Sequence, residues 1–198
     1  MIMEPAYPAY ADANVMDGRE IIYIPSNETN GFTPAPPSEP IQALIYLCSP
    51  NNPTGAVFSK ELLQKWVDYA NRTESVILFD AAYEAFITEE GIPHSIYEVS
   101  GARTCAIEIC SLSKTAGFTG TRCGYTVIPF DLERDGFSLN TMWVRNRTTI
   151  TNGVSCIIQK GALAVFSEEG QNEVQKLLSV YRKNARILMH AQIGRAHV

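Results

Sequence analysis

The feature that most constrains the fold of this chain is a series of short apolar runs, each of which ends at polar or turn-forming residues. The runs cover residues 43–48, 76–79, 106–110 and 124–128, and they are followed by Ser49, Asp80, Ser111 and Pro129. Runs of this length between turn signals are typical of buried strands. We therefore expect these four segments to belong to one central sheet.

A helix is expected between the first two of these strands. Ser59 can cap it, and residues 62, 63, 66, 67 and 70 place apolar side chains on one face of a helix that runs to about Asn71. Alternation of strand and helix predicts an α/β fold with three layers, α/β/α, around a mostly parallel sheet, although the strand at 124–128 could run in either direction. A further strand is expected at 20–25, and a long amphipathic helix at about 172–190.

Composition excludes several classes of protein. The chain has 198 residues, of which 45% are hydrophobic and 19% charged, as in globular proteins, and its net charge of −5 with no basic run argues against nucleic acid as a partner. No segment approaches the roughly 20 apolar residues that cross a membrane. Five cysteines without a CxxC pair predict reduced, mostly buried thiols and no metal site. The sequence therefore predicts a cytoplasmic protein.

Polar residues whose side chains could take part in binding or catalysis follow three of the predicted strands. They are Asn52 in Asn52-Pro53-Thr54-Gly55, Asp80 with Tyr83, and Ser111, Ser113 and Lys114 with Arg122 a few residues later. Each set has an ordinary structural interpretation, because such residues also form turns, cap helices or lie solvated at the surface. In α/β folds, however, ligands bind where parallel strands end.

Taken in this order, the three sets resemble the cofactor-binding core of the class I and II aminotransferases, enzymes with the aspartate-aminotransferase fold. The resemblance rests on residues 49–55 (SPNNPTG), 80–83 (DAAY) and 111–125 (SLSKTAGFTGTRCGY). It implies pyridoxal 5'-phosphate as cofactor. The family's lysine, which binds the cofactor covalently and then moves a proton, falls on Lys114.

The resemblance also implies a role for each of the other residues. The family's aspartate, which keeps the pyridine nitrogen protonated, falls on Asp80. Asn52 and Tyr83 match the residues that hold the phenolic oxygen. Ser111, Ser113 and Arg122 match the phosphate-binding residues, since hydroxyls donate to phosphate and a guanidinium pairs with it bidentately.

Two further positions are expected to reach the cofactor or the substrate. Tyr7 resembles the residue that stacks on the cofactor ring, although a tyrosine in a Pro-flanked strand could equally pack in the core or at an edge. Asn152 is similar to an asparagine that reaches a neighbouring subunit's site, and it could also be an N-cap or turn residue. Tyr7, Asn52 and Asn152 are thus the candidate substrate contacts.

Residues 117–120, 7–12 and 151–153 most resemble the LL-diaminopimelate aminotransferase subfamily. Those homodimeric enzymes convert LL-2,6-diaminopimelate and 2-oxoglutarate to tetrahydrodipicolinate and glutamate in lysine biosynthesis. The resemblance covers residues 5–190, about half of a two-domain enzyme, and residues 191–198 are expected to form an unrelated tail. The arginine that grips the substrate carboxylate is expected outside this stretch, so the chain by itself should not be a competent enzyme.

Three alternatives remain. Other enzymes of this fold use the same lysine, aspartate and arginine for β-elimination, decarboxylation or racemisation. The chain could instead be a non-catalytic, cofactor-binding fragment. A nucleotide-binding α/β domain shares the alternating pattern, but no GxGxxG or GxxxxGK[ST] turn is present in the sequence.

Overall fold

The computed structural model describes residues 1–193, with side chains through residue 191. The predicted tail falls mostly on residues 194–198, outside the described part of the chain. The structure divides into two compact units. We call residues 1–111 and 124–153 the sheet unit, and residues 112–123 together with those from 154 onward the helical unit.

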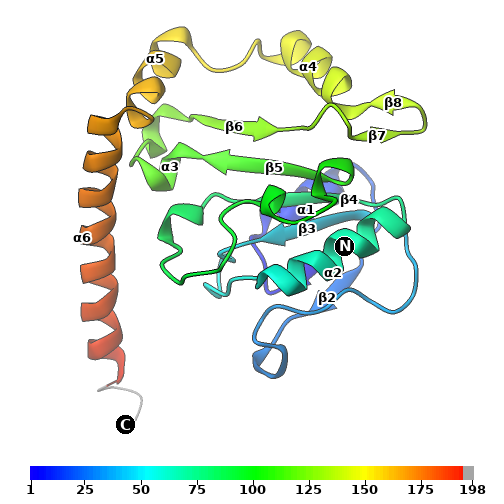
Figure 1. Cartoon of the computed structure of the whole chain (residues 1–198), viewed down its shortest axis with the longest axis horizontal. Coiled ribbons are helices and arrows are strands. Elements are labelled where there is room, and N and C mark those ends of the chain that lie inside the picture. Colours follow the sequence, from blue (N-terminus) through cyan, green and yellow to red (C-terminus); the bar gives the residue numbers. More distant parts are fainter. Residues whose placement is uncertain (194–198) are drawn as a thin grey trace. The chain divides into compact units, whose positions relative to one another are not determined.

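The sheet unit is built on a mostly parallel sheet (Figure 1). In the described part of the chain its six strands follow the order β2-β1-β3-β4-β5-β6. They are β1 (Ile2–Glu4), β2 (Tyr23–Pro25), β3 (Leu44–Cys48), β4 (Val76–Asp80), β5 (Ala106–Ser111) and β6 (Gly124–Val127). All neighbours pair in parallel except β6, which is antiparallel to β5. The four strands predicted at residues 43–48, 76–79, 106–110 and 124–128 are confirmed as β3, β4, β5 and β6, whereas β1 was not predicted.

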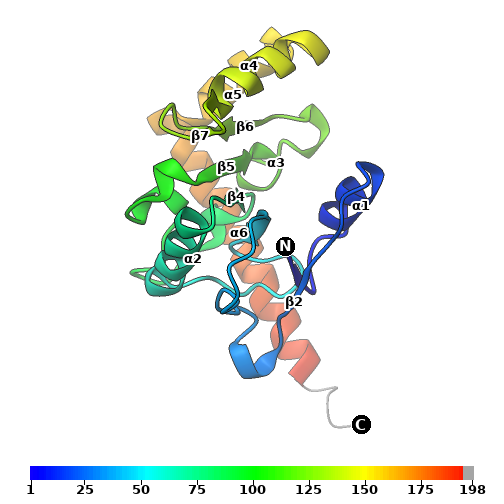
Figure 2. The ribbon, with the colours of Figure 1, turned by 90° about the vertical axis from the view of Figure 1, so that its right-hand side faces the viewer.

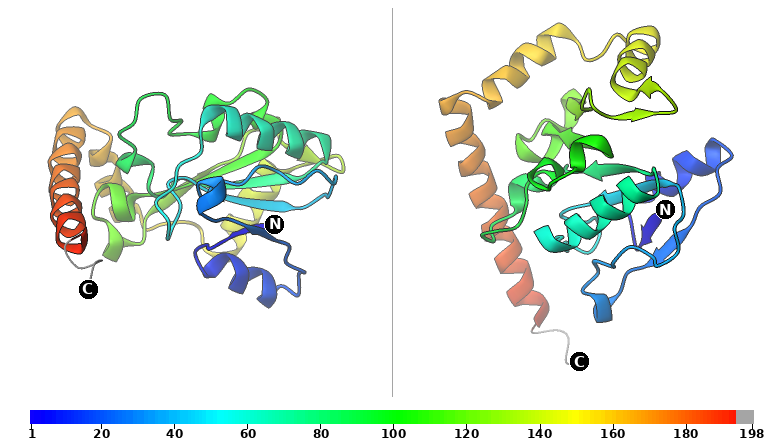
Figure 3. Two further views of the ribbon diagram at one scale, coloured as in Figure 1. Left: turned by 90° about the horizontal axis from the view of Figure 1, so that it is seen from below. Right: turned by 45° about the vertical axis from the view of Figure 1, so that its right-hand side comes forward.

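Helices lie on both faces of this sheet. Helix α2 (Lys60–Arg72) covers one face and α1 (Ala9–Met16) the other, as two views at right angles show (Figure 2; Figure 3, left). The predicted cap of α2 is confirmed, because the Ser59 hydroxyl accepts a hydrogen bond from the Leu62 backbone N–H at 3.2 Å. The mostly parallel α/β fold and its three layers are therefore as expected.

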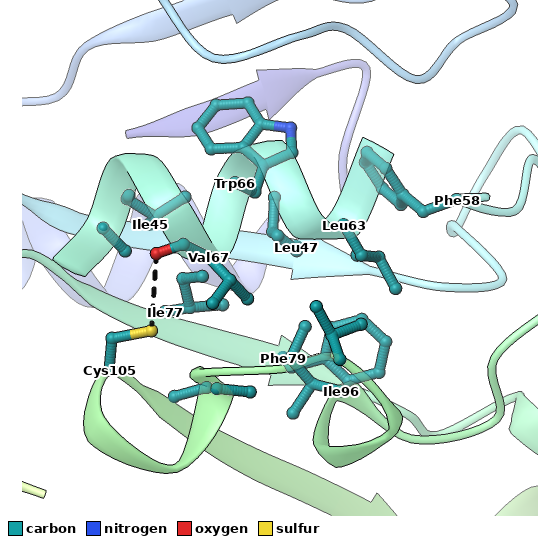
Figure 4. Packing of buried hydrophobic residues seen from close by; sticks show 14 of the residues in the cluster. Ile45, Leu47, Phe58, Leu63, Trp66, Val67, Ile77, Phe79, Ile96 and Cys105 are labelled. Atoms are coloured by element: carbon teal, nitrogen blue, oxygen red, sulfur yellow. Dashed lines mark hydrogen bonds between the residues drawn. The ribbon is translucent and has the colours of Figure 1, made fainter. Parts of the chain in front are cut away.

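The main core lies between α2 and the sheet (Figure 4). Ile45 and Leu47 of β3 are in register with Ile77 and Phe79 of β4, and all four side chains are fully buried. Their neighbours on α2 are Leu63, Trp66 and Val67. Each such side chain contributes roughly 1.5–3 kcal/mol through its removal from water. This packing fixes the strands whose ends carry the candidate site.

Short elements complete the sheet unit. They are the 3₁₀ turns η1 (Glu28–Asn30), η2 (Glu84–Phe86), η3 (Ile96–Glu98) and η4 (Ala102–Thr104), the hairpin of β7 (Glu133–Arg134) and β8 (Phe137–Ser138), and helix α4 (Leu139–Ile150). The Arg134 guanidinium donates to the carbonyl oxygens of Glu74 and Thr104, at 2.8 and 3.1 Å. It thereby ties the hairpin to the segments that precede β4 and β5.

The helical unit contains α3 (Leu112–Thr115), the turn η5 (Thr119–Thr121), α5 (Cys156–Val165) and α6 (Glu168–Ile193). Helix α6 confirms the predicted C-terminal helix and begins four residues earlier than residue 172. Helix α4 was not predicted, whereas the helix expected after Gly153 is observed as α5. No helix of the described residues is long and apolar enough to cross a membrane.

Candidate cofactor site

The ends of three neighbouring strands bring the predicted residues of the sheet unit to one edge. Cys48, the last residue of β3, is in register with Asp80, the last residue of β4. Asp80 in turn pairs with Ile109, two residues before Ser111 ends β5. The segments that carry Asn52, Tyr83 and Ser111 therefore leave the sheet at the same edge, where α/β folds bind ligands.

Asp80 is half-buried, and both of its carboxylate oxygens accept hydrogen bonds. The Ala82 backbone N–H donates to Oδ1 at 3.0 Å, and the Tyr10 hydroxyl donates to Oδ2 at 2.5 Å. Each oxygen of a carboxylate can accept a second bond. The carboxylate is therefore held in a fixed orientation and keeps accepting capacity for a ligand.

The Asn-Pro-Thr-Gly turn is organised by the asparagine that precedes it. The Asn51 backbone N–H donates to the Ala56 carbonyl oxygen at 2.8 Å, and the Asn51 side chain donates to Thr54 Oγ1 at 2.9 Å. Gly55 has a φ of 74°, which favours glycine. Asn51 thus holds the turn together, and both Asn51 and its neighbour Asn52 line a cavity.

That cavity has a volume of about 440 Å³ and lies in the sheet unit. Asn52 and Tyr83 both line it, together with apolar residues that include Val57, Phe86 and Ile87. Pockets of this size that combine an apolar lining with a few polar groups are typical of small-molecule sites. The structure therefore brings together both residues that the resemblance assigns to the cofactor's phenolic oxygen.

Ser113, Lys114 and Arg122 belong to the helical unit, on a segment that directly follows β5. Lys114 is exposed in the short helix α3. The Leu112 backbone N–H donates to the Cys123 carbonyl oxygen at 3.1 Å, which closes the segment into a loop. Within the loop, Thr119 Oγ1 donates to the Ser113 carbonyl oxygen, and the Arg122 guanidinium donates to that of Thr119. The three residues therefore lie on one compact loop.

Comparison with known proteins identifies the family. A sequence profile described as "Aminotransferase class I and II" matches residues 1–192. The chain belongs to this family. The aminotransferases of the family bind pyridoxal phosphate.

Solved aminotransferases share this fold. L,L-Diaminopimelate aminotransferase from Chlamydomonas reinhardtii is 38% identical, with a TM-score of 0.92 over 98% of this chain and 51% of that one. The aromatic aminotransferase of Pyrococcus horikoshii is 26% identical and has a TM-score of 0.79. The match covers 94% of this chain and 50% of that chain. A double mutant of Thermus thermophilus aspartate aminotransferase, 24% identical, matches in fold with a TM-score of 0.82, over 98% of this chain and 50% of the other. The chain thus spans about half the length of these relatives.

The functional groups of the candidate site residues in this aminotransferase chain match those that the family's cofactor requires. A carboxylate can pair with a pyridinium nitrogen, an amide and a phenol can bond to a phenolic oxygen, and two hydroxyls with a guanidinium suit a phosphate. Asp80, Asn52 and Tyr83 supply the first groups from the sheet unit. Ser111 at the end of β5 carries a hydroxyl, and the loop of the helical unit carries a second hydroxyl, a guanidinium and the amine of Lys114.

Tyr7 and Asn152 lie outside the strand ends and the cavity described above, one before α1 and the other after α4. Tyr7 precedes α1 rather than lying in a strand, its side chain is 48% exposed, and its ring meets that of Tyr10 edge-on at 5.8 Å. Core packing is therefore excluded, and stacking on the cofactor stays a prediction. Asn152 has a φ of 52° just after α4, and the N-cap of α5 is Ser155, so Asn152 is a turn residue.

Tyr10 is the site residue that sequence reasoning missed. It lies 70 positions from Asp80, and its hydroxyl meets that carboxylate because α1 packs against the sheet. The sequence around it, Tyr7-Pro8-Ala9-Tyr10, contained a signal: proline is favoured at a helix start, so the second tyrosine falls in the first turn of a helix.

Proposed function

We propose that this chain forms the cofactor-anchoring part of a pyridoxal-phosphate-dependent aminotransferase, with Lys114 as the anchor. The observation that carries the proposal is that Asp80 ends β4 beside the end of β3, and that Asn52 and Tyr83, which follow these two strands, line one cavity in a chain of this family. Pyridoxal phosphate, when bound, supplies an electron-withdrawing ring that stabilises negative charge at the substrate's α-carbon.

The chain's own residues hold the group and handle the proton. Asp80 accepts a hydrogen bond from the ring nitrogen and favours its charged form. Asn52 and Tyr83 donate to the phenolic oxygen, while Tyr7 stacks on the ring. Ser111, Ser113 and Arg122 bind the phosphate. With the cofactor bound, the Lys114 amine would be the group that holds it, and the same amine, once free, would move the substrate's α-proton.

The substrate we propose is LL-2,6-diaminopimelate with 2-oxoglutarate as amino acceptor, in lysine biosynthesis. Its support is the 38% identity to a solved L,L-diaminopimelate aminotransferase, together with segments 7–12, 117–120 and 151–153. Asn52 and Asn152 would contact the substrate, the latter from the neighbouring subunit of a homodimer. This reaction belongs to the whole protein, because the chain spans about half the length of that relative.

Covalent attachment at Lys114 can be tested on the chain itself. After pyridoxal phosphate is added, a visible absorbance band should form, and borohydride followed by peptide mass spectrometry should place the reduced cofactor on Lys114. Lys114→Ala should abolish the band and the labelled peptide. Lys160→Ala, which removes another exposed lysine of the helical unit, should leave both unchanged. Labelling at other lysines in place of Lys114 would refute the anchor.

Substrate class needs a separate test on the longer protein. Glutamate formation from 2-oxoglutarate should be faster with LL-2,6-diaminopimelate than with aspartate or an aromatic amino acid. A preference for either of the other donors would refute the proposed substrate but would still support the proposal that the protein is an aminotransferase. Loss of carbon dioxide or β-elimination without amino transfer would favour another enzyme class of this fold.

A further inference from the structure

Tyr10 sits at the centre of a group of polar side chains on the face of the sheet that α1 covers. We define the Tyr10 cluster as Tyr10 and Asn14 of α1, Tyr46 and Cys48 of β3, and Asp80 of β4. Tyr10 reaches the end of β4 from α1, and its hydroxyl donates to Asp80 Oδ2 at 2.5 Å. At this length the hydrogen bond is of the strong, charge-assisted kind.

The Tyr10 side chain is held in place by its neighbours. Its ring packs on that of Tyr46 with the centroids 5.0 Å apart and the planes tilted by 31°. The Asn14 amide donates both to the Tyr10 carbonyl oxygen at 2.7 Å and to the Tyr46 hydroxyl at 2.9 Å, and Asn14 is 6% exposed. These contacts fix the direction in which the Tyr10 hydroxyl points.

The hydroxyl of Tyr10 also remains protonated. Its pKa lies well above the ordinary tyrosine value, first because the side chain is buried and then because Cys48 and Asp80 lie close by. The raised pKa favours the protonated form of Tyr10, in which the hydroxyl is a hydrogen-bond donor. With the Ala82 N–H on Oδ1, it gives the Asp80 carboxylate a donor on each oxygen.

We propose that Tyr10 is a positioning residue, which orients the Asp80 carboxylate toward the pyridine nitrogen of pyridoxal phosphate. The inference rests on the proposed function, since Asp80 is the residue assigned to that nitrogen. Hydrogen-bonded residues behind a ligating carboxylate fix its orientation and its charge. Without the hydroxyl, the carboxylate rotates more freely and the ring nitrogen's proton is less well supported.

The first test needs no cofactor. Denaturant unfolding of the unaltered chain, Tyr10→Phe, Asp80→Asn and the double variant forms a double-mutant cycle. A coupling of roughly fivefold or more in the unfolding equilibrium constant is expected, because the hydroxyl and the carboxylate contact each other. Tyr69→Phe is the matched control: its hydroxyl donates to the Glu39 carbonyl oxygen at 2.9 Å in the same unit. Additive effects of Tyr10→Phe and Asp80→Asn would overturn the inference.

The second test measures binding of pyridoxal phosphate by absorbance. Tyr10→Phe should raise Kd roughly tenfold, as expected for a lost hydrogen bond to a charged group, whereas Tyr69→Phe should stay within about twofold. In an Asp80→Asn background, Tyr10→Phe should cause no further loss of affinity for pyridoxal phosphate. The pH at which the bound cofactor's absorbance changes should shift by roughly 0.5 unit or more in Tyr10→Phe and not in the control.

These outcomes separate the inference from the function on which it rests. Unchanged binding and an unchanged pH profile in Tyr10→Phe, when the unaltered chain binds the cofactor, would overturn the inference alone. If Tyr10→Phe weakened binding of pyridoxal phosphate equally in the presence and absence of the Asp80 carboxylate, the inference would also be overturned, since Tyr10 would then have only a packing role. A folded, unaltered chain that binds no pyridoxal phosphate would overturn the proposed function and this inference with it.

Discussion

Glu108 is a buried carboxylate inside a strand, at 7% exposure. Its Oε2 accepts hydrogen bonds from Ser95 Oγ at 2.6 Å and from the Ile96 backbone N–H at 2.9 Å. A charged group is tolerated in a core only when it is paired in this way. Glu108 interrupts the apolar run at 106–110 because it ties the turn at η3 to β5.

The cysteines also confirm a sequence expectation, since none forms a disulfide and four of the five are buried. Burial raises the pKa of the Cys105 thiol to about 11, and the same cause, with Asp80 adding to it, raises the pKa of Cys48 to about 11. The Cys105 thiol also lies 3.9 Å from the Val67 carbonyl oxygen (Figure 4). Both thiols are therefore protonated in the folded protein near neutral pH.

These raised pKa values predict a loss of stability at alkaline pH. Between about pH 9 and 11 the unfolded chain loses thiol protons that the folded chain retains, so the free energy of unfolding should fall as pH rises. The fall is expected to be on the order of 1 kcal/mol per buried thiol. Denaturant unfolding at a series of pH values measures it.

Two cysteine variants give the controls for this pH dependence. Cys105→Ala should show a shallower decline than the unaltered chain, even though it starts from a lower stability because of the cavity. Cys156→Ala removes the exposed thiol and should leave the decline unchanged. Equal slopes in Cys105→Ala and the unaltered chain would contradict the assignment of the effect to Cys105.

At the level of elements, the helices differ in how far the sequence predicts them. Helix α2 has a serine cap and five buried residues on one face, so its periodicity is clear. Helix α4 has a cap at Ser138 but buries no residue, and three of its apolar side chains are consecutive, at residues 142–144. A consecutive apolar run obscures the spacing of three and four residues that marks an amphipathic helix, which is why α4 was missed.

Substitution of two glycines in the helical unit, Gly161 in α5 and Gly170 in α6, is expected to have opposite effects on stability. A Cβ atom at Gly170 would overlap the Ala164 carbonyl oxygen, whereas one at Gly161 in α5 would meet no atom within 4 Å. Gly170→Ala should therefore destabilise the helical unit by roughly 1–3 kcal/mol. Gly161→Ala should stabilise it by about 0.5–1 kcal/mol, because alanine favours helix.

Hydrogen exchange of α5 and α6 amides, read by mass spectrometry, measures both changes locally. Protection should fall in Gly170→Ala and hold or rise in Gly161→Ala. Equal protection in the two variants would show that the close approach at Gly170 is relaxed at no cost.

For the whole molecule, exposed apolar side chains on α4 predict self-association. Met142 and Val144 are each 52% exposed, and Trp143 and Ile150 are exposed as well. Exposed apolar side chains gathered on one element mark contact sites in proteins. Sedimentation of the chain should therefore show a mass that rises with concentration.

Substitution on this helix should weaken the association. Met142→Glu combined with Val144→Lys is expected to raise the dissociation constant by roughly tenfold or more. Val15→Glu, at an exposed apolar position of α1, is the matched control and should have little effect. A monomer at all concentrations would contradict the prediction.

The sequence by itself determined strands β3 to β6, the capped helix α2, and the order of Asn52, Asp80, Tyr83 and Lys114 along the chain. Each of these depends on neighbours within about one element, where apolar runs, caps and turn residues act locally. The same local logic places the polar residues at strand ends, and strand pairing in register then brings those of the sheet unit to one edge.

Only the tertiary structure decided which distant residues support them. The antiparallel direction of β6, the contact of Glu108 with Ser95, and the bond from Tyr10 to Asp80 follow from strand pairing and from the packing of turns and helices on the sheet. Such contacts join residues far apart in the chain and leave no periodic trace in the sequence. The carboxylate at position 80 was therefore readable from the sequence, and its hydrogen bond with Tyr10 was not.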